Sequence, residues 1–266
     1  MRLKISHTTA YGYDRPVPYA LQQVRLTPKS HGAQRVLRWE TRVEGGQTEV
    51  SFEDSHRNRV DLVSFTPGTT AITVVSEGEV ELSQTHGVVG QHGGFMPLWM
   101  FERVTPLTKP GVAVRRLAAS VAGEANILAR MHLLMAAVRN AVAYEAGHSH
   151  AGTTAEEALQ AGYGVCQDHA HVFVACARAT GVPARYVSGY LHMPDRVQQD
   201  AMHAWAEAWV PDLGWVGFDP PNEICPDMTH VRVATGLDYR DAAPVSGTRL
   251  GEGGESLTVT VAVQQQ

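Results

Sequence analysis

The sequence predicts an α+β protein in which helices pack on an antiparallel sheet, preceded by an all-β, sandwich-like domain. Two observations predict this architecture. Apolar and polar residues alternate through residues 1–82 between short turn segments, as in the strands of a sandwich. Beyond residue 113 the apolar spacing takes the 3.6-residue period of helices, and after Pro183 it returns to a period of two. Helices followed by consecutive strands favour an α+β core over alternating β–α units.

Short strands account for most of the first segment, residues 1–82. Alternation is clear in five runs, at residues 2–5, 34–39, 48–52, 58–63 and 72–82. Turn-forming groups such as Thr66-Pro67-Gly68 separate the runs. Since no group of reactive side chains gathers in this segment, we expect a structural or substrate-positioning domain.

Residues 83–112 differ in composition from the segments on either side. They are rich in Gly, His and Pro, and they contain the apolar run Phe95-Met96-Pro97-Leu98-Trp99-Met100-Phe101. We interpret them as a packed linker whose apolar run covers a contact between domains.

Helices and then strands follow in the third segment, residues 113–266. One helix is expected at 124–142, and a capping box at Thr154–Glu157 opens a short helix that ends before Gly162. Another helix is expected at 167–180, before the stop signals Gly181 and Pro183. Five strands are then predicted, at 184–191, 203–210, 215–219, 231–234 and 257–263.

Composition excludes several classes of function. The chain has 266 residues, 44 % of them hydrophobic and 18 % charged, with a net charge of −5 and no basic cluster. We therefore expect neither nucleic acid nor a membrane as partner, and no run is long enough to cross a bilayer. The start of the chain lacks the apolar centre of a secretory signal. Three cysteines do not make a disulfide framework, so a cytoplasmic location is expected.

The stretch Gly162–His171 holds the first candidate for chemistry. Two glycines bracket a turn, and Cys166 then opens the predicted helix. Unpaired N–H groups and the positive end of the helix dipole favour a thiolate at that position. A buried cysteine at an ordinary loop-to-helix junction is the competing interpretation, since free cysteine is among the most buried residue types.

A predicted strand pair supplies two partners for that thiol. With a five-residue turn at 210–214, Trp209 lies opposite Trp215, and the odd positions of both strands share a face. His203 and Asp219 then become diagonal neighbours, roughly 7 Å apart and within reach of a side-chain hydrogen bond. An imidazole oriented by a carboxylate can take the thiol proton and return it to a leaving group. The N–H of Cys166 could stabilise the oxyanion of a tetrahedral intermediate.

Three blocks of the sequence resemble those of the transglutaminase-like superfamily: Gly164-Val165-Cys166-Gln167-Asp168, His203-Ala204-Trp205-Ala206-Glu207 and Gly214-Trp215-Val216-Gly217-Phe218-Asp219-Pro220. The resemblance implies a papain/transglutaminase-like core within residues 113–266. It also implies Cys166 as nucleophile, His203 as general base and acid, and Asp219 as the orienting carboxylate. The first half, with His7, Tyr11, Tyr13, Pro16 and Leu26-Thr27-Pro28, is similar to the β domain of bacterial members. His169 departs from the pattern, since an aromatic residue is expected there.

The resemblance implies acyl transfer through a cysteine thioester on peptide or protein amides. We expect no cofactor and no metal. The superfamily includes cross-linking enzymes, peptidases, deamidating enzymes and inactive relatives, and the fold alone does not separate them. We expect a peptidase or amidohydrolase. A protein-glutamine cross-linking transamidase and a catalytically inactive binding module are the alternatives.

A metal site is the competing interpretation of the histidines around Cys166. His169 and His171 lie nearby, and His148 and His150 precede them in a loop. A helix turns about 100° per residue, so His171 points away from the cysteine's face, and no paired ligand motif is present. We therefore expect exposed or packed histidines here.

Overall fold

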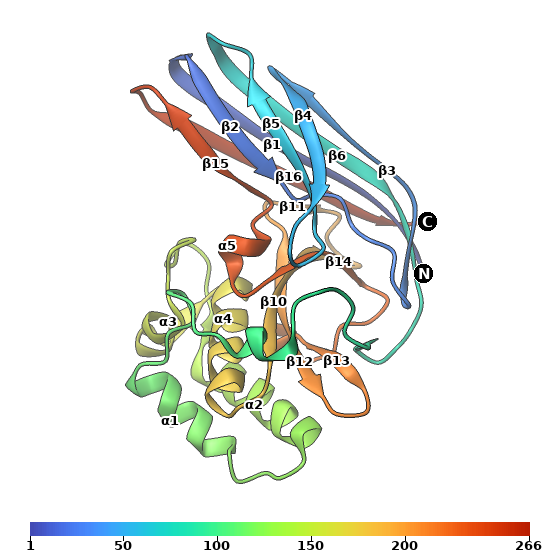
Figure 1. Cartoon of the computed structure of the whole chain (residues 1–266), viewed down its shortest axis with the longest axis vertical. Coiled ribbons are helices and arrows are strands. Elements are labelled where there is room, and N and C mark those ends of the chain that lie inside the picture. The colour runs from blue at the N-terminus through green and yellow to red at the C-terminus, as the bar shows by residue number, and fades with distance from the viewer.

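The computed structural model describes residues 1–266, and it has a β-sandwich at one end and a half built of helices and a second sheet at the other (Figure 1). The chain crosses between the two parts several times, and both termini lie at the edge of the sandwich. No helix has the length and apolar character needed to span a membrane.

Two antiparallel sheets form the sandwich. One has the order β11-β16-β1-β6-β3 and the other the order β15-β2-β5-β4. Their apolar side chains meet in a core that includes Val24, Val63 and Ile72. The strands are β1 (Arg2–Val17), β2 (Tyr19–Val24), β3 (Gln34–Glu44), β4 (Gly46–Glu53), β5 (Arg59–Phe65), β6 (Thr69–Leu82), β11 (Gln198–Gln199), β15 (Val245–Leu250) and β16 (Glu255–Gln265). The sandwich expected for residues 1–82 is thus present.

The C-terminal strands differ from the expectation. We placed them with the core at 113–266, but β16 pairs along β1 from Leu3–Gln265 to Tyr13–Glu255, and β15 pairs with β2. Residues 245–266 therefore complete the two sheets of the sandwich. The alternation of these residues specified a strand and its buried face, but an alternating strand carries no information about which edge it will pair with.

The core sheet has the order β14-β10-β12-β13-β7, all antiparallel. Its strands are β7 (Val88–Gly90), β10 (Ala184–Leu191), β12 (His203–Val210), β13 (Gly214–Phe218) and β14 (His230–Gly236). The expected strands at 184–191 and 203–210 match β10 and β12 residue for residue. The expected register is confirmed too, because Trp209 lies opposite Trp215.

The helices α2 (Ile127–Ala141) and α4 (Cys166–Ala179) pack on one face of this sheet, and α1 (Val112–Val121) and α3 (Ala155–Ala161) pack against α4. The capping box expected at Thr154 and Glu157 is present at the start of α3. α4 is nearly all buried and packs on the small side chains of β12, where Ala206 and Ala208 join its residues in one apolar core. Because β12 contributes only methyl groups to this contact, α4 can pack close to the strand.

The segment expected as a packed linker, 83–112, contributes to the core. β7 adds an edge strand to the sheet beside β13, and a 3₁₀ turn, η1 (Leu98–Glu102), follows. Phe101 is buried against Trp215, but Phe95 and Trp99 are exposed. The apolar run therefore covers a contact at one of its residues and leaves others in solvent.

The opposite face of β12 is closed by a buried ion cluster. Glu207 is fully buried and bonds Arg185 of β10 at 2.6 Å and Arg232 of β14 at 2.7 Å. These charge-assisted bonds join three adjacent strands, and together they hold the pKa of Glu207 at about 2 against the effect of burial, which alone would raise it.

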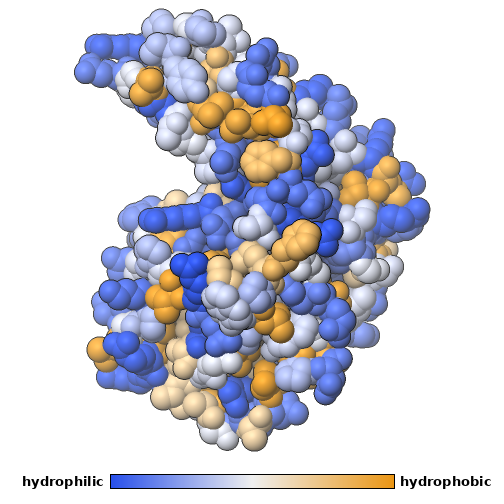
Figure 2. All heavy atoms as spheres, viewed as in Figure 1, coloured by the Kyte–Doolittle hydropathy of each residue, from blue (hydrophilic) through white to orange (hydrophobic).

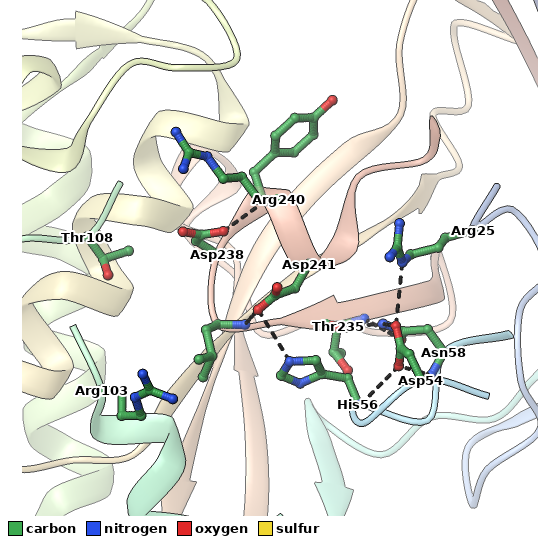
Figure 3. Close-up of polar contacts among 12 residues, drawn as sticks. Arg25, Asp54, His56, Asn58, Arg103, Thr108, Thr235, Asp238, Arg240 and Asp241 are labelled. Atoms are coloured by element: carbon green, nitrogen blue, oxygen red, sulfur yellow. Dashed lines mark hydrogen bonds and ion pairs between the residues drawn. The ribbon is translucent and has the colours of Figure 1, made fainter. Parts of the chain in front are cut away.

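A polar network holds the sandwich against the core (Figure 3). The Asn58 side chain donates to the Thr235 carbonyl at 2.7 Å and accepts from the Thr235 N–H at 2.9 Å, as a paired strand residue would. His56 contacts Asp241 at 3.3 Å in the short helix α5 (Tyr239–Ala242), and Asp54 accepts from Arg25. Because Asn58 is buried, breaking this contact would leave unpaired polar groups, so the two parts are fixed to each other.

Candidate active site

The turn before α4 places Cys166 at the first residue of the helix. Gly162 ends α3 in the left-handed region with φ of 77°, which glycine adopts without strain. At Gly164 a Cβ would lie 2.7 Å from the Asp168 side chain, so that position also needs glycine. The buried Asp168 carboxylate accepts from the Val165 N–H at 2.8 Å and the Ser149 hydroxyl at 2.6 Å. These contacts fix the backbone just before the thiol.

The environment of Cys166 suits a reactive thiol. Its backbone N–H has no acceptor within the chain, as expected at a helix start, and the thiol lies at the positive end of the α4 dipole. The side chain is 9 % exposed and forms part of a cavity wall. A free N–H beside the thiol can donate to an oxyanion formed there.

The structure brings His203 and Asp219 to Cys166. His203 begins β12, Asp219 follows the end of β13, and His203 Nε2 lies 2.8 Å from Asp219 Oδ2. The Nε2–H therefore donates to the carboxylate, which leaves Nδ1 of a neutral ring as the base. Both residues are buried, with Asp219 completely so.

Charge interactions within this group oppose the effect of burial. Burial alone would lower the pKa of His203, but the charge and hydrogen bond of Asp219, and then the nearby Cys166 side chain, raise this pKa to about 10. Burial would likewise raise the pKa of Asp219, but His203 and then His230 hold it far below the usual range. The arrangement therefore favours a protonated imidazole beside the Asp219 carboxylate.

Two further residues contact Asp219, and sequence reasoning missed both. His230 at the start of β14 places Nε2 3.0 Å from Asp219 Oδ2, and the Asn222 amide donates to the same oxygen at 2.7 Å. The other side of the His230 ring faces Asp227 and Thr229. The alternation of His230-Val231-Arg232-Val233 could have indicated that His230 and Arg232 share a face, but not which carboxylates they meet.

The tryptophans of this region belong to the core. Trp205 and Trp215 are buried and do not line the cavity at Cys166. Trp205 packs edge-on against His230, with ring centroids 5.3 Å apart. It thereby supports the rings that contact Asp219.

The histidines near Cys166 do not gather into a metal site. His169 places its two ring nitrogens 2.9 Å from the Val165 carbonyl and 2.8 Å from the Val142 carbonyl. His171 accepts from the Tyr239 N–H at 3.1 Å on another side of α4, as its helical position predicts. His169 therefore joins the turn before the thiol to the end of α2, which gives a structural role to the residue that departs from the family pattern.

One other group has a ligand-like composition, namely His203, Asp219 and His230. Both histidine Nε2 atoms lie at hydrogen-bond distance from one carboxylate oxygen, and the Asn222 amide donates to that oxygen as well. A metal would require these nitrogens to turn their lone pairs toward it, whereas here they act as donors. The geometry fits a buried carboxylate that orients imidazoles.

The two other thiols have different surroundings. Cys176 lies within α4 in the apolar core, where burial raises its pKa to about 12. Burial also raises the pKa of Cys225, which has no histidine or carboxylate bonded to it. Of the three cysteines, only Cys166 therefore combines a helix start with an imidazole.

Cys166 and His203 line a cavity of about 510 Å³ between the core and the sandwich. β1 and β16 supply one wall, and α4, β10, β12 and α5 supply the other. Figure 2 shows the surface hollowed where these two parts of the molecule meet. A volume of this size is in the usual range for small-ligand sites.

Comparison with known proteins assigns both parts of the chain. Residues 115–220 match the model of the transglutaminase-like superfamily, and residues 3–81 match that of the bacterial transglutaminase-like N-terminal region. The uncharacterized protein ML0607 of Mycobacterium leprae is 28 % identical over 98 % of both chains. A protein-glutamine gamma-glutamyltransferase of Pseudomonas aeruginosa is 35 % identical over 97 residues, which cover 32 % of this chain and 14 % of that protein.

Among solved structures, that of a putative cysteine protease from Cytophaga hutchinsonii has the same fold. Its TM-score is 0.79 at 22 % identity, and the alignment covers 99 % of this chain and 90 % of that chain. The sandwich is therefore part of the shared fold together with the core.

Proposed function

Because the chain belongs to the transglutaminase-like superfamily, with a bacterial-type N-terminal region ahead of its core, we propose that it is a thiol-dependent enzyme acting on peptide or protein amides. In this proposal Cys166 is the nucleophile, His203 the general acid and base, and Asp219 the carboxylate that orients His203. Hydrolysis is the favoured outcome, so the enzyme would be a peptidase or amidohydrolase. The observation that carries the proposal is the 2.8 Å bond between His203 and Asp219 beside a cysteine at a helix start.

The first half of the reaction forms a thioester. The Cys166 thiolate attacks the amide carbonyl, and the N–H of Cys166 donates to the oxyanion. His203 then gives its proton to the leaving nitrogen as the C–N bond breaks. The released amine departs, and the acyl group stays on sulfur.

The second half returns the enzyme to its starting state. Once Cys166 is acylated, its sulfur carries no negative charge. That charge is one of the causes that raise the pKa of His203, so this pKa falls. The ring is then more readily neutral and can deprotonate water, which attacks the thioester. The acid leaves, Cys166 returns as thiolate, and His203 holds the proton again.

Selective alkylation tests the proposal. We expect iodoacetamide near neutral pH to label Cys166 at least 100-fold faster than Cys176 or Cys225, since a thiolate rather than a thiol reacts. The variant His203→Ala should lose that excess. Cys176 and Cys225 serve as internal controls within the same chain. Equal labelling of all three cysteines would refute the assignment of Cys166 as the nucleophile.

Transamidation is the second candidate, because the similar segment of the Pseudomonas aeruginosa protein belongs to a protein-glutamine gamma-glutamyltransferase. Partition of the acyl-enzyme between water and an added primary amine separates the two outcomes. We expect free acid as the main product with a millimolar amine such as glycine ethyl ester. Predominantly amide product would assign the chain to the transamidases.

The proposal also includes the cytoplasm as compartment. All three cysteines are unpaired, and a nucleophilic thiol has to stay reduced.

A further inference from the structure

The cavity at Cys166 has a wall that belongs to the sandwich. In the pairing of β1 with β16, Tyr11 lies opposite Leu257 and Thr9 lies opposite Val259. All four residues line the cavity. Since side chains alternate between the faces of a strand, these two pairs present one continuous face to the thiol side of the molecule.

The cavity has few charges besides those of the catalytic group. Its only other Arg, Lys, Asp or Glu residues are Arg196 and Asp200, which bond each other at 3.0 Å and are exposed. The ring of His7 in the sandwich wall is bonded to Tyr190 and Thr9, and burial lowers its pKa to about 4, so it is neutral near pH 7. No free charge is available to pair with a charged group of a ligand.

Uncharged groups, tyrosine hydroxyls among them, supply the remaining polarity of the lining. Tyr11, Tyr186 and Tyr239 line the cavity, and none of their hydroxyls has a hydrogen-bond partner within the chain. Around them lie apolar side chains such as Met202 and Val259. Aromatic rings that carry neutral donors are suited to an uncharged aromatic or apolar group.

The wall is held in place before any ligand enters. Tyr239 lies in α5, whose Asp241 contacts His56 of the sandwich and whose first N–H donates to His171 of α4. The network in Figure 3 thus connects α5 to the β4–β5 loop, and through it the sandwich wall to the core wall. A fixed wall can discriminate between side chains because it cannot adapt to a poor fit.

We propose that this cavity binds an uncharged aromatic or apolar side chain of the peptide that acylates Cys166, and that the sandwich is the specificity-determining part of the enzyme. The inference rests on the proposed function of Cys166 and deepens it. A charged side chain would lose its hydration in the cavity without gaining a counter-ion, which makes its binding unfavourable.

Two chloromethyl ketones that differ in side chain test this proposal. The full-length protein is alkylated with tosyl-phenylalanyl and tosyl-lysyl chloromethyl ketone, and each rate is divided by that probe's rate with glutathione. We expect the normalised rate at Cys166 to be at least tenfold higher for the phenylalanyl probe. Equal rates, or a faster lysyl probe, would overturn the proposal.

Variants on β16 test whether the sandwich causes the preference for the phenylalanyl probe. Leu257→Arg places a charge on the cavity face at a position exposed enough to tolerate it, and Thr258→Arg places the same charge on the outer face. We expect the phenylalanyl rate, relative to iodoacetamide, to drop at least tenfold in Leu257→Arg and to stay within twofold in Thr258→Arg. The deeper variant Val259→Arg should reproduce the loss, and thermal unfolding confirms that each variant is folded.

The outcomes separate this inference from the proposed function. If iodoacetamide does not prefer Cys166 over the other two cysteines, the proposed function fails. If that preference holds but Leu257→Arg and Thr258→Arg behave alike, only the role of the sandwich is refuted.

Discussion

Two buried carboxylates on one sheet have nearly the same surroundings and different chemical capacities. Glu207 of β12 accepts from Arg185 and Arg232, and Asp219 after β13 accepts from His203 and His230. Both carboxylates are completely buried, and each joins side chains from neighbouring strands. Each also has its pKa held low by its partners against the effect of burial.

The difference lies in what the partners can release. A guanidinium does not give up its proton in a protein, so the Glu207 cluster can only hold strands together. An imidazole can give up its proton, and His203 holds that proton beside a thiol and a cavity. The same geometry is therefore structural in one place and suited to catalysis in the other, and the basic residue type decides which.

Changing Asp219 to Asn should have the largest effect. The amide cannot support a charged His203 or select its tautomer, so we expect the rate of amide hydrolysis to fall about 10³- to 10⁴-fold. Asp212→Asn, in the exposed turn of the same hairpin, is the matched control and should leave the rate unchanged. Full activity in Asp219→Asn would show that Asp219 has only a structural role, like Glu207.

The pH profile of the same variant sharpens the comparison. The pKa of His203 is raised from its ordinary value of 6.5 to about 10, so the folded protein keeps the imidazolium at neutral pH and loses it as the pH rises through about 10. The free enzyme should therefore keep its acid on His203 well into the alkaline range. Asp219→Asn removes the charge that raises this pKa, so the alkaline limb of kcat/KM should move to lower pH.

Glu207→Gln should destabilise the fold without touching the site. It leaves two buried guanidinium groups without a counter-charge, and we expect a loss of about 3–5 kcal/mol in the free energy of unfolding, measured with denaturant. Glu81→Gln removes the partner of Arg35 from an exposed pair and should have no measurable effect. Equal losses in the two variants would contradict the assignment of the Glu207 cluster to the core.

His230→Asn tests whether the second histidine at Asp219 positions the first. We expect a fall of about 10- to 100-fold in kcat with little change in KM, because Asp219 would lose one of its three donors and shift. A structural role alone would lower the melting temperature and leave the pH profile in place. A displaced alkaline limb in His230→Asn would show that the ring acts through Asp219 on His203.

Much of the core could be predicted because its signals are local. β12 and β13 are joined by a short turn, so their alternation and the facing tryptophans determine a register, and with it the nearness of His203 and Asp219. Cys166 could be chosen as a candidate from the glycines and the helix start around it. These inferences use residues that are close in sequence.

The features that could not be predicted depend on pairing between distant strands. β16 pairs with β1 across nearly the whole chain, and β14 lies beside β10 after an intervening hairpin. His230 reaches Asp219 only through that sheet order, and Leu257 reaches the cavity only through the pairing with β1. A period of two determines which face a residue occupies, but not which strand lies next to it.

His169→Phe should have the smallest effect and restores the aromatic residue expected at that position. The phenyl ring fills a similar space but removes both contacts to carbonyl oxygens. The Val165 carbonyl keeps its helical N–H partners at 3.0 and 3.1 Å, so the cost falls mainly on the Val142 carbonyl. We expect a loss of about 1–2 kcal/mol in unfolding free energy, and His169→Gln, which can donate to one carbonyl, should lose less. Selective iodoacetamide labelling of Cys166 should persist in both variants, because His169 contacts backbone carbonyls while His203 is the imidazole that shares the cavity with the thiol. Loss of selective labelling in His169→Phe with unfolding unchanged would instead show that this ring acts directly on the thiol.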